Sequence, residues 1–149
     1  MKMRTESTHD YLTLRCIERI WIRQRTSTDY DLHVLTPRAV PVEHYEMMCA
    51  ALSTFPAEVL ELAIESIAQV EREEIQKSSV GINATSAVFN STKATFWFEF
   101  GFTEGYVDDG YGEEGGEVTL AQFKLAVQTY LQFLRDPDRK PIEVPFPLQ

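Results

Sequence analysis

The sequence has few of the residues on which enzymes most often rely. It holds only two cysteines, Cys16 and Cys49, and three scattered histidines, His9, His33 and His44. No pair of these residues has the spacing of a metal site, and there is no G-x-S-x-G nucleophile motif. Isolated cysteines in apolar surroundings are typical of small core side chains in a reducing compartment. We therefore expect a protein that is not an enzyme and that needs no cofactor or metal.

Long apolar runs are also missing. The stretch 9–25 carries a charge every few residues, so we expect neither a signal peptide nor a membrane span there, and we expect a cytoplasmic protein. A chain of 149 residues most often forms one domain. We expect that domain to cover residues 9–149, after a disordered start at residues 1–8.

Positive charge is scarce and unevenly placed. The net charge is −9, from 23 acidic and 14 basic side chains. Residues 1–26 hold six bases against three acids, so residues 27–149 carry a net −12. From Ala94 to Phe123 there are seven acids and neither Lys nor Arg. Because nucleic acids and anionic membranes both require positive charge, we expect neither as a partner.

The hydrophobic pattern predicts an α+β fold, with helices packed on a small, mainly antiparallel sheet. Helices are expected from Pro41 to Thr54 and from Pro56 to about Gln76. Residues 9–24 fit either a helix or an alternating strand, and their length favours the helix. Strands are expected at residues 31–35, 80–89, 92–102 and 142–146, the last at a sheet edge because it contains proline.

The C-terminal helix has the clearest local pattern. Thr119 and Gln122 match a capping box, and Val118 with Phe123 matches the hydrophobic staple around it. An apolar stripe then follows at helical spacing through residues 119–134. We expect this stripe to cover the phenylalanine face of the strand 92–102 in a common core formed by Phe98, Phe100, Phe123, Val127 and Tyr130.

The segment 103–117 is predicted to be a long glycine-rich loop. Within it, Gly110–Gly115 matches the G-x-G-x-x-G pattern of dinucleotide sites. Such a site places a pyrophosphate at a helix N-terminus, where Glu113 and Glu114 would repel it. The strand before the loop is also expected to be antiparallel, so we interpret the match as chance. The acids of the loop do not have the spacing of a calcium-binding EF-hand loop either.

This loop is a candidate contact surface for a basic protein. Its acids alternate with tyrosines, which anchor many interfaces, and charge of one sign accelerates encounter with a partner of the opposite sign. The plain alternative is a solvated acidic loop without a partner. The candidate partner-binding residues are Trp97 and Glu99 on the preceding strand and, in the loop, Glu104, Tyr106, Asp108, Asp109, Tyr111, Glu113, Glu114 and Glu117.

The aromatic strand 96–102, the acidic loop and the closing helix together resemble bacterial immunity proteins of contact-dependent and polymorphic toxin systems. The resemblance implies a small cytoplasmic α+β protein that binds and blocks one cognate toxin, often a nuclease, through its acidic loop. A chaperone or adaptor that binds an extended polypeptide is the alternative. A small metal-assisted hydrolase that uses the acid cluster is a second alternative.

Overall fold

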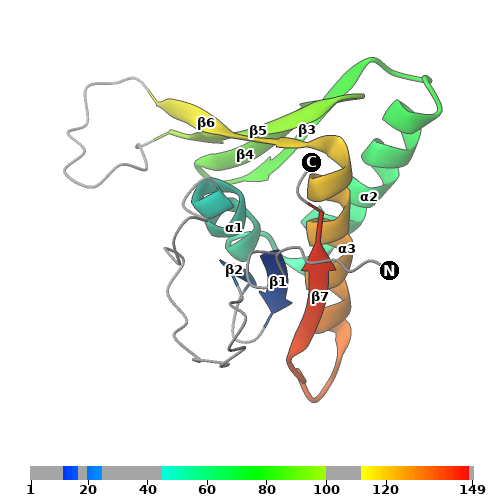
Figure 1. Cartoon of the computed structure of the whole chain (residues 1–149). Helices are drawn as coiled ribbons and strands as arrows, with labels where there is room; N and C mark the ends of the chain where they lie inside the picture. Colours follow the sequence, from blue (N-terminus) through cyan, green and yellow to red (C-terminus); the bar gives the residue numbers. More distant parts are fainter. Residues whose placement is uncertain (1–11, 17–19, 25–44, 100–111, 148–149) are drawn as a thin grey trace, which may run out of the picture.

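The structure is a computed structural model that describes residues 12–16, 20–24, 45–99 and 112–147 (Figure 1). In chain order its elements are β1 (Leu12–Cys16), β2 (Ile20–Gln24), α1 (Glu46–Ser53), α2 (Ala57–Glu71), β3 (Lys77–Ile82), β4 (Thr85–Asn90), β5 (Lys93–Phe98), β6 (Glu113–Thr119), α3 (Leu120–Arg135) and β7 (Ile142–Phe146). The predicted disordered start at residues 1–8 and the predicted strand at residues 31–35 lie outside the described residues.

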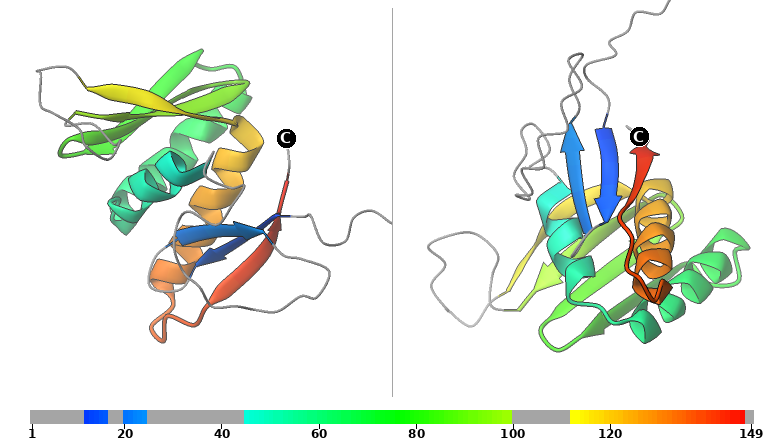
Figure 2. Two further views of the ribbon diagram at one scale, coloured as in Figure 1. Left: turned by 60° about the vertical axis from the view of Figure 1, so that its left-hand side comes forward. Right: turned by 90° about the horizontal axis from the view of Figure 1, so that it is seen from below.

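The strands form two antiparallel sheets with helices between them. One sheet has the order β2-β1-β7 and the other the order β3-β4-β5-β6. Figure 2 shows α1 and α3 between the two sheets, while α2 packs along α3 and against β3. The predicted α+β class with antiparallel strands is confirmed, and the strands divide into two sheets where we expected one.

The core lies where α3 meets the inner face of the four-stranded sheet. The Phe123 ring is 5.3 Å from the ring of Phe89 and 5.7 Å from that of Phe96, between centroids. Phe98, Val127 and Tyr130 are buried in the same apolar cluster. The predicted core is therefore confirmed for its described members, and Phe100 lies outside the described residues.

The helix favoured for residues 9–24 is wrong, because the described part of this stretch forms the strands β1 and β2. β1 pairs with β2 on one side and with β7 on the other, so Leu14 faces Ile22 and Val144. Leu14 and Cys16 are fully buried, two residues apart, as a strand requires. Pairing with the distant β7 decides the conformation here, because strand preference depends strongly on the tertiary neighbours.

The single strand predicted at residues 80–89 is also wrong. The chain turns at Asn83 and Ala84, so β3 and β4 form a hairpin in which Ile82 pairs with Thr85. Asn83 has φ 57°, a left-handed conformation that asparagine tolerates better than most residues. Between β4 and β5, the predicted hairpin at residues 90–93 is confirmed.

The helix boundaries match the prediction in part. α1 ends at Ser53, one residue before the expected Thr54, and the predicted start at Pro41 lies outside the described residues. α2 ends at Glu71, before the expected Gln76, and Glu73 then adopts a left-handed φ of 64°.

The predicted capping box and edge strand are both confirmed. The Thr119 hydroxyl accepts the N–H of Gln122 at 3.0 Å, and the Gln122 Oε1 atom accepts the N–H of Thr119 at 2.9 Å. β7 lies at the edge of its sheet, next to β1.

Candidate functional site

The four-stranded sheet has one covered face and one face open to solvent. The helices lie against the inner face (Figure 1). Alternation along β5 places Phe96 and Phe98 inward, where they are buried, and Trp97 outward, where it is 37% exposed. The register of the strands then defines the outer face as Lys77, Ser79, Gly81, Ser86, Val88, Lys93, Thr95, Trp97, Glu114 and Glu117.

Trp97 is held in place on this outer face by its neighbours. Its register partners are Ser86 on β4 and Glu114 on β6. The six-membered part of the indole ring lies against Gly112, so close that a Cβ atom at position 112 would overlap it. The ring therefore covers backbone on one side and leaves part of its surface to solvent.

The acids nearest to Trp97 lie on a strand, so the prediction that residues 113–117 belong to a loop is wrong. β6 begins at Glu113 and pairs with β5, although its Glu-Glu-Gly-Gly-Glu stretch has low strand propensity. Strand alternation divides the three acids between two faces. Glu114 pairs with Trp97 on the outer face, whereas Glu113 pairs with the inward-facing Phe98.

The two outer-face acids have different surroundings. The Thr95 hydroxyl donates a hydrogen bond to Glu114 Oε2 at 2.9 Å, which orients a carboxylate that remains exposed. Lys93 Nζ lies 3.6 Å from Glu117 Oε1, and both side chains are about half exposed. Such an exposed pair contributes little to stability, but it reduces the negative field at Glu117. Glu114 is thus the stronger outer-face candidate for attracting a basic partner.

The other predicted contact residues are either exposed or outside the described part of the chain. Glu99 is exposed directly after β5, and its N–H donates to the carbonyl of Ala84 at 2.8 Å. Five of the predicted contact residues lie outside the described residues: Glu104, Tyr106, Asp108, Asp109 and Tyr111. The described part of the candidate site therefore consists of Trp97, Glu99, Glu114 and Glu117 with the outer face around them, while Glu113 belongs to the inner side of the sheet.

Gly115, the last glycine of the G-x-G-x-x-G match, and its neighbour Gly116 have a packing role that the sequence interpretation missed. Gly115 and Gly116 lie in β6, and the helix α3 begins only at Leu120. A Cβ atom at position 116 would lie 2.6 Å from Met47 Cβ, and Gly116 has φ 70°, which favours glycine. These glycines let α1 approach the sheet, and a register irregularity between Ala94 and Phe96 lies opposite them.

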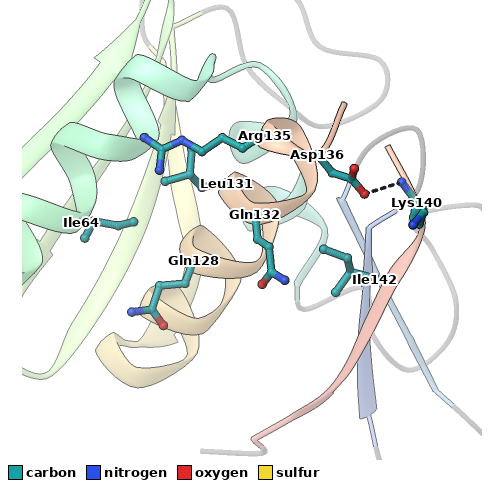
Figure 3. A pocket seen from close by; sticks show the side chains of 8 residues that line it. All are labelled: Ile64, Gln128, Leu131, Gln132, Arg135, Asp136, Lys140 and Ile142. Carbon is teal, nitrogen blue, oxygen red and sulfur yellow. Dashed lines mark hydrogen bonds between the residues drawn. The ribbon is translucent and has the colours of Figure 1, made fainter. Parts of the chain in front are cut away.

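A groove between α2 and α3 was not predicted. Figure 3 shows one end of it, a pocket of about 510 Å³ lined by Ile64, Leu131 and Ile142 together with Gln128, Gln132, Arg135, Asp136 and Lys140. A second pocket of about 500 Å³ lies toward the start of α3, and Gln128 lines both. No sequence signal could have found this groove, because it depends on how the two helices pack.

Several charged groups along this groove are held by ion pairs or by backbone hydrogen bonds. Arg135 pairs with Glu61, and Lys124 Nζ lies 3.0 Å from Glu71 Oε1. The Asp136 carboxylate accepts the N–H groups of Asp138 and Lys140, and these two hydrogen bonds lower the pKa of Asp136. The groove therefore presents mainly amide and apolar side chains to a ligand.

Reactive side chains are sparse in the described ranges. Both cysteines are buried and neither forms a disulfide. Burial raises the pKa of Cys16 to about 12, so this thiol stays protonated and is a poor nucleophile at neutral pH. Within residues 12–16, 20–24, 45–99 and 112–147, no three His, Cys, Asp or Glu side chains gather where they could hold a metal ion. None of the helices in this part of the chain combines the length and apolar character needed to cross a membrane.

Comparison of the chain with protein-family models, curated protein sequences and solved structures finds no match. A functional conclusion therefore rests on the residues described above.

Proposed function

We propose that this protein acts by binding another protein through the outer face of its four-stranded sheet, with Trp97 as the anchor. The observation that carries the proposal is the placement of the Trp97 ring, which is fixed against Gly112 and yet 37% exposed. Tryptophan is among the residues most often found at the energetic centre of protein interfaces. Because the ring is already fixed, it loses little conformational freedom on binding.

The charge of the chain supports a basic partner. Residues 27–149 carry a net −12, and Glu99 and Glu114 lie exposed near Trp97. A negative field of this kind accelerates association with a positively charged protein and slows association with nucleic acid. The partner that fits best is the basic domain of a toxin that this protein neutralises, as in the immunity proteins that the sequence resembles. We infer a cytoplasmic location, because a reducing compartment keeps buried cysteines such as these out of disulfides.

Binding kinetics with the product of the neighbouring gene test this proposal. We expect Trp97→Ala to speed dissociation strongly, since loss of a hot-spot aromatic costs about 2 kcal/mol or more, roughly thirtyfold in affinity. Glu114→Gln should mainly slow association, and the effect should disappear at high salt because exposed charges are screened. The control is Leu62→Ala, which removes another exposed hydrophobic side chain, 57% exposed, from α2.

The same assay can contradict the proposal. If Trp97→Ala and Leu62→Ala dissociate at the parent rate, the outer face is not the contact surface. If the parent binds unfolded polypeptides of many sequences as tightly as a folded basic domain, the protein acts as a chaperone or adaptor. A neighbouring gene product that does not bind at all contradicts the assignment as its immunity protein.

A further inference from the structure

Among the described residues, the outer edge of β3 carries backbone groups that no other strand pairs with. The N–H of Glu99 donates to the carbonyl of Ala84, so these two residues form a hydrogen-bonded pair of the antiparallel ladder. Such pairs recur at every second residue, so Ser86 and Val88 also bond toward β5. The alternate β4 residues Thr85, Ala87 and Phe89 must then bond toward β3. Their partners there are Ile82, Val80 and Ser78.

It follows that the other β3 residues point their N–H and C=O groups away from the sheet. These residues are Lys77, Ser79 and Gly81, and all three are exposed. No hydrogen bond of the described residues reaches the backbone of these residues from outside the sheet. A strand edge of this kind is a template for pairing with another strand.

Two other sheet edges of the described fold carry features that discourage such pairing. β6 has Glu113, Glu114 and Glu117, with the left-handed Gly116 opposite the register irregularity in β5. Along β7 and its flanks, the four alternate positions from 141 to 147 hold three prolines and one acid. These residues are Pro141, Glu143, Pro145 and Pro147. Proline lacks an N–H, and charges and irregularities keep strands from adding to an edge. β3 has none of these features, and its one charged residue is Lys77 at its start.

We propose that β3 pairs antiparallel with β3 of a second copy of this chain, about a twofold axis at Ser79. Ser79 then faces Ser79 of the second copy, and Lys77 faces Gly81. Each of these pairs can exchange two backbone hydrogen bonds, and the two four-stranded sheets become one continuous sheet. A twofold contact of this kind is self-complementary and closed.

The register brings no like charges together when the occupant is a second copy. Lys77 meets a glycine, which has no side chain to oppose it, and that glycine is required because a Cβ at position 81 would lie 2.6 Å from the Thr85 carbonyl oxygen. The two copies of Lys77 are separated by four residues of strand, about 14 Å, which exceeds the screening length of about 8 Å at physiological salt. Self-pairing of β6 would instead bring its acids together, where like charges repel.

Sedimentation analysis from about 1 µM to about 100 µM protein tests the dimer, and we expect a monomer–dimer equilibrium in this range.

Ser79→Pro removes an N–H that the ladder with β4 does not use, so the monomer should still fold while the dimer weakens at least about tenfold. Ser79→Thr keeps the N–H and should dimerise like the parent. Ser79→Lys, which places two like charges opposite each other, should weaken the dimer as well, whereas Val88→Lys on the interior strand β4 should not.

Amide hydrogen exchange locates the contact independently of any substitution. The Ser79 and Gly81 amides should exchange more slowly as the protein concentration rises, while the Val80 amide, which bonds within the ladder, should be protected at all concentrations. A parent protein that stays monomeric at about 100 µM overturns the proposal, even if the edge accepts a strand from another protein. A dimer that forms equally well with Ser79→Pro and Ser79→Lys, without concentration-dependent protection of the Ser79 amide, overturns it too.

Discussion

The indole ring of Trp97 lies against Gly112 with no space for a side chain between them. A Cβ atom at position 112 would overlap the ring, so Gly112→Ala must displace it. Gly112 lies directly before β6, outside the buried core, and we expect the substitution to leave the fold intact. In a Trp21→Phe background, in which Trp97 is the one tryptophan left, its fluorescence should change and partner binding should fall as with Trp97→Ala. Unchanged fluorescence would show that the ring does not depend on this glycine.

Phe96 and Trp97 are neighbours on β5 with opposite roles. Phe96 is fully buried against Phe123, so Phe96→Ala should lower the free energy of unfolding by about 3–5 kcal/mol, through lost apolar burial and a cavity. Trp97→Ala should cost less, because a ring at the surface leaves no closed cavity. Denaturant unfolding of both variants measures the difference. Equal losses in the free energy of unfolding would mean that Trp97 is as deeply buried as Phe96, and that the outer face of the sheet is not open to solvent.

Gly115 and Gly116 are adjacent, yet we expect different costs for replacing them with alanine. Gly116→Ala places alanine at a φ of 70° and makes its Cβ overlap Met47 Cβ. Met47 Cβ can move away only together with the backbone of α1. The cost of Gly116→Ala should be about 1–3 kcal/mol in the free energy of unfolding. Gly115→Ala meets the flexible end of the same side chain, with Met47 Sδ 3.2 Å away, and should cost less. Thermal melts of the pair check the order, and the reverse order would contradict the packing of α1 on β6.

Gln122 joins three parts of the fold. Besides its role in the capping box, its side-chain Nε2 donates to the Pro147 carbonyl at 2.8 Å and to the Tyr45 hydroxyl at 3.3 Å. Thr119→Ala removes only the cap and should cost about 1 kcal/mol. Gln122→Ala should cost more, about 2–3 kcal/mol, because it also leaves the Pro147 carbonyl without this donor. Denaturant midpoints compare the two variants. Equal losses in the free energy of unfolding would show that Gln122 stabilises the fold only as a helix cap.

Features encoded within a few residues could be predicted from the sequence. The capping box at Thr119 and Gln122 and the alternating phenylalanines of β5 are local patterns, and the structure retains them. The same alternation accounts for the exposure of Trp97, because a strand turns successive side chains to opposite faces. The prolines of residues 141–147 placed β7 at an edge for an equally local reason.

Features that depend on distant pairing could not be predicted. β1 is a strand because β7, more than 120 residues further along the chain, lies beside it. Low strand propensity predicts a loop for the segment from Glu113 to Glu117. The segment nevertheless pairs with β5, and its acids divide between the two faces of the sheet. The groove around Gln128 forms only when α2 and α3 pack together, so the sequence of neither helix alone predicts it.

Site-specific photocrosslinking in cells shows whether a partner protein covers the outer face around Trp97. Val88 is 39% exposed on the outer face, and its register partner Thr95 lies two residues from Trp97, so a photoreactive residue at position 88 samples a partner bound there. We expect one basic protein to be crosslinked from position 88, none from the exposed position 62 on α2, and loss of the crosslink when Trp97→Ala is added. The account is contradicted if position 62 captures the same protein as efficiently, or if Trp97→Ala leaves the crosslink from position 88 unchanged.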